Sequence, residues 1–137
     1  MNKRIGLLTI LVLIFISGCK LETPLKDDLN LTMDDFTMNQ FSDEGQILYT
    51  IISPKSNINK ITQIYELDNV KIIFYEDEIP KYIVTADSAI LDNYILNLDG
   101  NVLIEDIDNT GGFIKSNTLY WDLNNELITL EGDVKLD

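Results

Sequence analysis

The stretch LNLDGNVLI at residues 96–104 is followed 32 residues later by ITLEGDVKL at residues 128–136. In both, apolar and polar residues alternate through a central pair of an acid and a glycine. A strand running straight through the glycine would place the even-numbered apolar residues on one face. Asp-Gly also favours a hairpin, but a hairpin here would leave stubs of about three residues, too short to be useful. We therefore expect continuous strands that bend at Gly100 and Gly132.

These two stretches belong to a longer repeat. ADSAILD at residues 86–92 matches SNTLYWD at residues 116–122, and YELDNVKI at residues 65–72 is a weaker third copy of the first pattern. In the weaker copy Asn69 takes the place of the glycine, and we expect Asp68-Asn69 to absorb a change of register. Repeats that each expose one apolar face must stack to bury it.

Alternation with period two continues from residue 31 to the end, and no helical stripe interrupts it. Besides the two quoted stretches, strands are predicted over residues 46–53, 61–76, 81–91 and 113–121, and Pro54 is expected to end the first of them. Short turns are expected at residues 92–93 and 123–125. The pattern predicts an all-β fold.

Composition excludes several classes of function. The chain has 137 residues, enough for one domain, with 10 basic and 23 acidic residues, a net charge of −13 and no histidine. Without an imidazole it has no Ser-His-Asp or Cys-His nucleophile and none of the usual zinc sites. Because nucleic-acid binding depends on Lys and Arg, so acidic a chain is expected to bind no nucleic acid.

The N-terminus resembles a bacterial lipoprotein signal peptide. Lys3 and Arg4 precede an apolar run over residues 5–16, and ISGC follows with the chain's one cysteine, Cys19. The alternative is an uncleaved membrane helix, but the run is well short of the roughly 20 residues that a span needs. We predict a signal peptide over residues 1–18, a lipidated Cys19 with a flexible tether over residues 19–30, and a β-domain over residues 31–137.

Acidic clusters are read as solvated surface. DIDNTG at residues 106–111 imitates the first half of a calcium loop, but residue 117 is Asn where a bidentate Glu is needed. The pairs at residues 27–28 and 34–35 and the triplet at residues 76–78 fall in the tether, a strand start and a turn. No metal, cofactor or catalytic residue is predicted.

The ordered series DEGQILYTIIS, YELDNVKI, IPKYIVTADSAILD and LNLDGNVLI, followed by the second quoted stretch, resembles the LptC family of lipopolysaccharide export. The resemblance implies a curved, partly open antiparallel β jelly-roll with an apolar groove for acyl chains, and no catalysis. It implies that lipopolysaccharide comes from the permease subunits of an inner-membrane ABC transporter. The cargo then passes to a periplasmic LptA-like bridge protein, which docks by edge-strand addition.

Two departures from the family pattern bear on these partners. Family members usually keep a transmembrane helix where this chain has ISGC, and relatives commonly continue with further strands after the second quoted stretch. We therefore expect attachment through a lipid anchor on the periplasmic side of a membrane, the inner membrane being favoured. The alternative function is a β-sheet lipoprotein that serves as an envelope adaptor or assembly factor without lipid transfer.

Parity and the resemblance together give candidates for the wall of the groove, although a dry core would use the same side chains. They are Tyr49, Ile51, Leu67, Val70, Ile72, Phe74, Ala89, Leu91, Leu96, Leu98, Val102, Ile104, Leu119, Trp121, Ile128, Leu130 and Val134. A groove of such residues gains roughly 0.8 kcal/mol for each acyl methylene taken from water.

Overall fold

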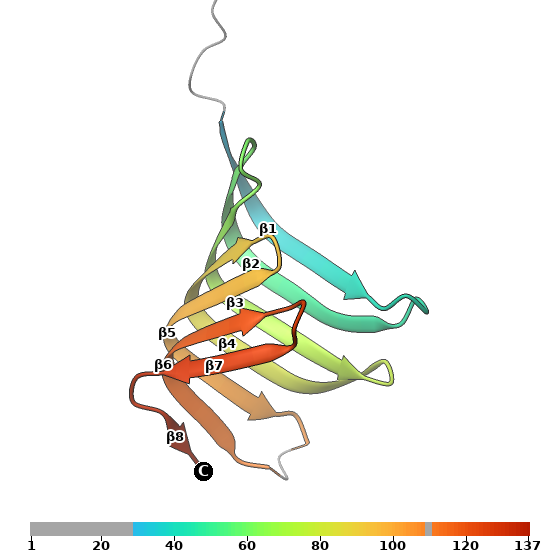
Figure 1. Ribbon diagram of the computed structural model, residues 1–137, viewed down its shortest axis with the longest axis vertical. Helices are drawn as coiled ribbons and strands as arrows, with labels where there is room; N and C mark the ends of the chain where they lie inside the picture. Colours follow the sequence, from blue (N-terminus) through green and yellow to red (C-terminus); the bar gives the residue numbers. More distant parts are fainter. Residues whose placement is uncertain (1–28, 109–110) are drawn as a thin grey trace, which may run out of the picture.

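A computed structural model describes residues 29–108 and 111–137. It is a single antiparallel sheet in which β1 to β7 lie side by side in chain order, while β8 pairs with β6 beyond the end of β7 (Figure 1). The predicted all-β, open antiparallel fold is confirmed. The strands are β1 (Asn30–Phe41), β2 (Ile47–Asn59), β3 (Tyr65–Glu76), β4 (Ile79–Asp92), β5 (Ile95–Asp106), β6 (Phe113–Asp122), β7 (Leu127–Glu131) and β8 (Lys135–Leu136).

Several strand boundaries differ from the prediction by one or two residues, and three differences are larger. β2 continues through Pro54 to Asn59, and β3 begins only at Tyr65, after a turn. The stretch at residues 126–136 is divided between β7 and β8, which both pair with β6. Pro54 is tolerated because the pairing of β2 with both neighbours is interrupted at this residue, so no ladder hydrogen bond needs its missing N–H.

One line of irregular residues crosses every strand of the sheet, and we call it the crease. Register pairs on both sides of the line place its members opposite one another. The crease consists of Asp35, Pro54, Asn69, Asp87, Gly100 with Asn101, Asn117, and Gly132 with Asp133. On the odd-numbered strands and at the β7–β8 break, these residues have positive φ, from 45° to 82°.

The crease takes two forms. Asn69, with φ 47°, switches the inward-facing side chains from Leu67 to Val70, but the pairing register is the same on both sides of it. The predicted register change at Asp68-Asn69 is therefore a change of face. At Gly100-Asn101 two residues lie opposite one, and the register with β4 and β6 shifts by one.

The crease folds the sheet over on itself, so that two walls face each other across an apolar interior (Figure 1). Wall A contains the strand segments 30–34, 55–59, 65–68, 88–92, 95–99, 118–122 and 127–131. Wall B contains the segments 36–41, 47–53, 70–76, 79–86, 102–106, 113–116 and 135–136. Side chains from β3 and β6, which are three strands apart in the sheet, meet in the interior, and this requires such a fold.

Small side chains line the inside of the crease. Ser53 and Ser56 on β2 and Ala86 and Ala89 on β4 are all buried, as is Ser116 on β6. The Ser53 hydroxyl lies 2.6 Å from both the Lys55 and the Asp68 carbonyl oxygens, and it donates its one hydrogen to them. The Ser116 hydroxyl donates to the Thr118 carbonyl at 3.0 Å. Serine is therefore small enough for the place where the walls converge, and its hydroxyl donates a hydrogen bond to backbone carbonyls near the interrupted ladder.

Candidate functional site

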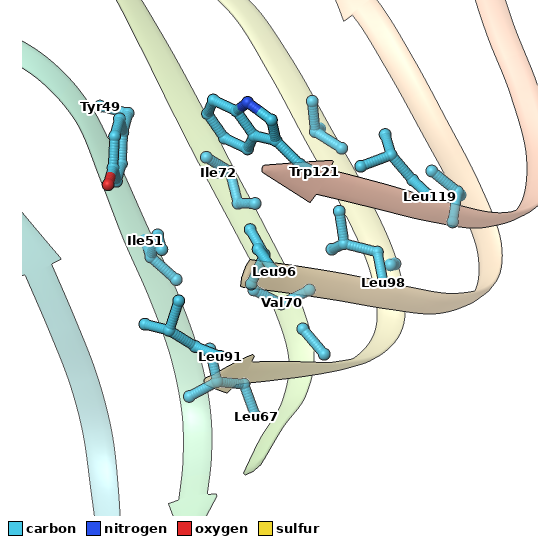
Figure 2. Packing of buried hydrophobic residues seen from close by; sticks show 14 of the residues in the cluster. Tyr49, Ile51, Leu67, Val70, Ile72, Leu91, Leu96, Leu98, Leu119 and Trp121 are labelled. Atoms are coloured by element: carbon cyan, nitrogen blue, oxygen red, sulfur yellow. The ribbon is translucent and has the colours of Figure 1, made fainter. Parts of the chain in front are cut away.

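The interior between the walls collects most of the predicted groove residues. Twelve of the seventeen are buried: Tyr49, Ile51, Leu67, Val70, Ile72, Ala89, Leu91, Leu96, Leu98, Val102, Leu119 and Trp121. Phe74, Ile104 and Leu130 are partly buried and pack against this cluster. Figure 2 labels ten of the buried candidates, whose side chains converge from β2, β3, β4, β5 and β6. The predicted residues thus form one continuous apolar interior.

The remaining two candidates lie near the edge of the sheet. Ile128 on β7 is 49% exposed, and Val134, in the break between β7 and β8, is 47% exposed. Among the described strands, none pairs with the far side of β7 or β8. Ile128 nevertheless faces the interior, where it lines a cavity described below.

An aromatic cluster joins the two walls. The Trp121 ring, on wall A, lies 4.8 Å from the Phe74 ring and 5.5 Å from the Tyr49 ring, both on wall B, measured between centroids. The three rings are tilted by 47° to 58°, in the range of favourable aromatic pairs. Burial raises the pKa of the Tyr49 hydroxyl. Contacts between side chains, and no backbone ladder, connect the walls at this point.

An apolar cavity of about 120 Å³ lies on one side of the aromatic cluster. Ile72, Phe74 and Val84 line it from wall B, and Leu98, Trp121 and Ile128 are among the residues that line it from wall A. No polar atom contributes to its surface. Ligand pockets usually measure about 300–1,000 Å³, so this cavity accepts a long alkyl chain only if the walls move apart.

A second cavity of about 490 Å³ lies on the other side of the cluster, where the tips of wall A approach β1 and β2. Its lining includes Tyr49, Tyr65 and Leu91, together with turn residues Tyr94 and Asn124. The Leu123 N–H donates to the Tyr94 carbonyl at 2.8 Å and so holds two of the wall A turns together. An apolar space and a more polar one therefore lie between the walls, with the aromatic cluster between them.

Several interior residues are absent from the predicted set. Phe36, Val84 and Ala86 are buried in the cluster, and Met33 and Met38 pack against it. The signal for Phe36 is present in the sequence, because LTMDDFTM at residues 31–38 is a further copy of the repeat. Asp35 takes the place of Asn69 in this copy, and Phe36 takes the place of Val70.

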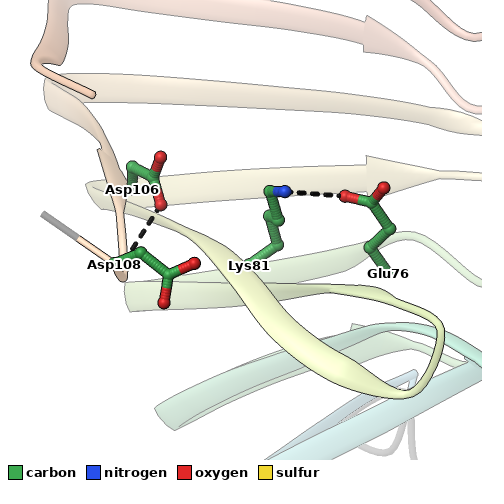
Figure 3. Close-up of polar contacts among 4 residues, drawn as sticks. All are labelled: Glu76, Lys81, Asp106 and Asp108. Atoms are coloured by element: carbon green, nitrogen blue, oxygen red, sulfur yellow. Dashed lines mark hydrogen bonds and ion pairs between the residues drawn. The ribbon is translucent and has the colours of Figure 1, made fainter. Parts of the chain in front are cut away.

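Of the predicted acidic clusters, those among the described residues lie at turns and strand ends, except Asp34 and Asp35, which are exposed within β1. The Asp106 carboxylate accepts a hydrogen bond from the Asp108 N–H at 3.0 Å, an Asx turn that uses this carboxylate locally (Figure 3). Lys81 Nζ lies 3.1 Å from Glu76 Oε2, and this hydrogen bond raises the pKa of Lys81. Within residues 29–108 and 111–137, no three His, Cys, Asp or Glu side chains gather as a metal site.

The predicted signal peptide over residues 1–18 and the lipidated Cys19 fall outside the described residues, as does the predicted tether over residues 19–30 except at its end, where β1 already begins at Asn30. In the part of the chain that the structure covers, no helix has the length and apolar character needed to cross a bilayer.

The described residues define the class of protein: an open antiparallel β-sheet folded over an apolar interior, with β1 at one edge and β7 and β8 at the other. The chain matches the model of the family described as "Lipopolysaccharide-assembly, LptC-related" over residues 5–137, and it belongs to this family. A comparison with curated proteins finds no match. Family membership gives the chain a role in lipopolysaccharide export, at the periplasmic side of the inner membrane. Its general partners are lipopolysaccharide and the proteins of the export complex.

Proposed function

We propose that the folded sheet accepts the acyl chains of lipopolysaccharide from the permease subunits of the inner-membrane ABC transporter and passes them to an LptA-like bridge protein. The observation that carries this proposal is the cavity between the walls, whose lining is wholly apolar. Each acyl methylene moved there from water contributes roughly 0.8 kcal/mol. No charged residue lines this apolar cavity, so no charged side chain there would hold a headgroup and delay release.

Loading requires the walls to separate. The contacts that must open are between side chains: the aromatic cluster, and the Phe36 ring of wall B against the Tyr65 ring of wall A, whose centroids are 5.6 Å apart. Acyl chains inserted beside Trp121 would replace the contacts that its ring makes with Phe74 and Tyr49. The apolar area that the rings bury against each other in the closed form would then be buried against lipid. The free-energy cost of separating the walls is therefore low when lipid is present.

The handover step is proposed to use the open edge of the sheet. β7 and β8 present backbone groups that are unpaired on the side away from β6 in the described chain. Edge-strand addition of a bridge protein there would extend both walls and continue the interior past Ile128. Ile128, Leu130 and Val134, which are exposed or half-exposed on this edge, would then be covered.

The anchor is proposed to be a lipid on Cys19, after removal of residues 1–18. The basic residues, the apolar run and ISGC support this processing. Cys19→Ser should abolish the mobility shift of lipidation and release the chain from membranes in cell fractionation. Unchanged processing and membrane attachment of Cys19→Ser would refute the anchor but would not affect the proposed lipid transfer.

Trp121 provides a test of acyl binding, because it is the only tryptophan in the sequence. Lipopolysaccharide carrying brominated acyl chains should quench Trp121 fluorescence on contact, whereas the unbrominated lipid should not. A Trp121→Phe, Tyr120→Trp variant is the control, because residue 120 points away from the interior and should not be quenched. Equal quenching at both positions, or none at Trp121, would contradict binding between the walls.

An adaptor without lipid transfer is a second candidate, and the direct contact between the walls favours it. The aromatic cluster closes the middle of the interior, and the apolar cavity beside it is small, about 120 Å³. Under this function the interior is a permanent core, and the edges bind proteins. Absence of Trp121 quenching together with intact capture of the export proteins would select this candidate.

A further inference from the structure

The cavity of about 490 Å³ at the wall A turns has the dimensions of a ligand pocket, and the acyl-binding proposal does not use it. Turn residues 62–63, 93–94 and 123–124 form its rim on one side, and β1 and β2 of wall B close the other side. The hydrogen bond from the Leu123 N–H to the Tyr94 carbonyl fixes two of these turns relative to each other. The pocket therefore has a defined rim.

Neutral hydrogen-bonding groups and aromatic rings dominate the lining. Gln40, Gln63, Asn93 and Asn124 provide carboxamides, each with donors and an acceptor, and Tyr94 adds a ring that is 55% exposed. Among the thirteen lining residues there is no Lys or Arg, and Asp92 contributes the one charge. Phosphate recognition relies on cationic side chains, so this lining disfavours a phosphate. Carboxamides suit hydroxyl groups, which also both donate and accept, and aromatic rings suit the C–H faces of a sugar ring.

This pocket borders the same aromatic cluster that borders the apolar cavity. Tyr49 lines the pocket and contacts Phe74 and Trp121, which line the apolar cavity. One layer of aromatic side chains thus separates a pocket with polar partners from a cavity without any. An amphiphile that replaces the ring contacts would place its apolar chains on one side and its hydroxylated head on the other.

We infer that this pocket binds the neutral, polyhydroxylated sugar part of the glycolipid cargo, while the acyl chains lie beyond the aromatic cluster. The inference rests on the proposed acyl binding, because the bound acyl chains are what would bring the attached sugar to this pocket. Under this inference, uncharged groups of the turns recognise the cargo. This agrees with the excess of acidic over basic residues in a chain whose net charge is −13.

The test uses the full chain in cells, with a photo-crosslinking benzoylphenylalanine at residue 94, 98 or, as a control, 120. Residue 94 lines the pocket, Leu98 lines the apolar cavity, and Tyr120 is an exposed tyrosine on the outer face of β6. Residue 94 lies in an exposed turn, so the substitution leaves the core intact. Isolated adducts are digested with a protease, and the adduct peptides are fragmented in a mass spectrometer so that the acyl chains separate from the glycan. An adduct made through sugar keeps the glycan, whereas an adduct made through an acyl chain keeps only a fatty acid.

The expected result is glycan retained on residue 94, fatty acid alone on residue 98, and at least fivefold fewer adducts at residue 120. Adducts at residue 98 without any at residue 94, or loss of the glycan from residue 94, would overturn the sugar site and leave the acyl proposal standing. No adduct at either residue 94 or 98 would overturn both. If Asn124→Lys increased the yield at residue 94 severalfold, phosphate would be the preferred group, and the neutral-sugar assignment would be wrong.

Discussion

Asp87 and Gly100 lie opposite each other within the crease, on the neighbouring strands β4 and β5, and the carboxylate of Asp87 occupies the space that a side chain at residue 100 would need. A Cβ built on Gly100 would lie 2.6 Å from Asp87 Oδ2 and 3.0 Å from Asp87 Cβ. The same carboxylate accepts a hydrogen bond from Asn101 Nδ2 at 2.8 Å. Gly132 repeats the arrangement beneath Asn117, whose Nδ2 would lie 2.7 Å from a Cβ. The bend at the crease thus depends on glycine at residues 100 and 132 for two reasons. The backbone there has positive φ, and a neighbouring side chain occupies the space that a Cβ would need.

Gly100→Ala should therefore destabilise the chain more than Gly45→Ala. Both glycines have positive φ, 82° and 84°, so both variants bear backbone strain of about 1 kcal/mol. No atom lies within 4 Å of a Cβ at Gly45, whereas Asp87 must move at Gly100. We expect Gly100→Ala to lower the free energy of unfolding in urea by about 2 kcal/mol and Gly45→Ala by about 1 kcal/mol.

A double-mutant cycle with Asp87→Ala isolates the contact between residues 87 and 100. In the Asp87→Ala background, the cost of Gly100→Ala should fall toward about 1 kcal/mol, because the carboxylate contact at 2.6 Å is gone and only the contact with the Cβ of residue 87 at 3.0 Å remains. A cost that is the same with and without the Asp87 carboxylate would show that this carboxylate plays no part in excluding a side chain at residue 100.

Ser53→Ala should cost about 2 kcal/mol, since it leaves the Lys55 and Asp68 carbonyls without their shared donor at a fully buried position. Ser88→Ala is the matched control, because the Ser88 hydroxyl is 3.4 Å from the Asp99 carbonyl at an exposed site. We expect the control to change the free energy of unfolding by less than about 0.5 kcal/mol. Equal effects in urea titrations would mean that the crease does not need the hydroxyl.

Asp122 makes stability depend on pH through the turn between β6 and β7. Its carboxylate accepts hydrogen bonds from the Asn125 side chain at 2.8 Å and from the Asn125 and Asn124 N–H groups at 3.1 Å, and these lower its pKa below the ordinary 3.8. The contribution is therefore fully present above the unfolded-state pKa and is lost as pH falls through the native pKa. Wild type should be more stable than Asp122→Asn at pH 7, and the difference should shrink as pH falls below 4 toward 2. A difference independent of pH would exclude the charge as its source.

The sequence allowed the interior of the central strands to be predicted from parity alone. Leu96, Leu98 and Val102 are buried on one face of β5, as the alternation through Gly100 indicated. The repeat also placed Leu119 and Trp121 correctly in the interior. These residues obey a rule of local spacing, and local spacing is what a single sequence records best.

The features that were missed depend on neighbouring strands. Pro54 looked like a strand end because the interruption of the ladder at this point arises from Asp35 and Asn69, on other strands. Phe36 was missed because two consecutive acids hide the repeat at residues 34–35. Val134 has the correct parity but lies exposed at an edge, and parity carries no information about which strands have a neighbour.

The proposal that acyl chains lie between the walls is tested most directly by photo-crosslinking in cells at Leu98 and at Asn97. These adjacent residues on β5 point to opposite faces: Leu98 is 1% exposed in the interior, and Asn97 is exposed on the outer face. The proposal predicts lipopolysaccharide adducts at residue 98 and few or none at residue 97. Adducts at residue 97 alone, or equal adducts at both residues, would contradict it.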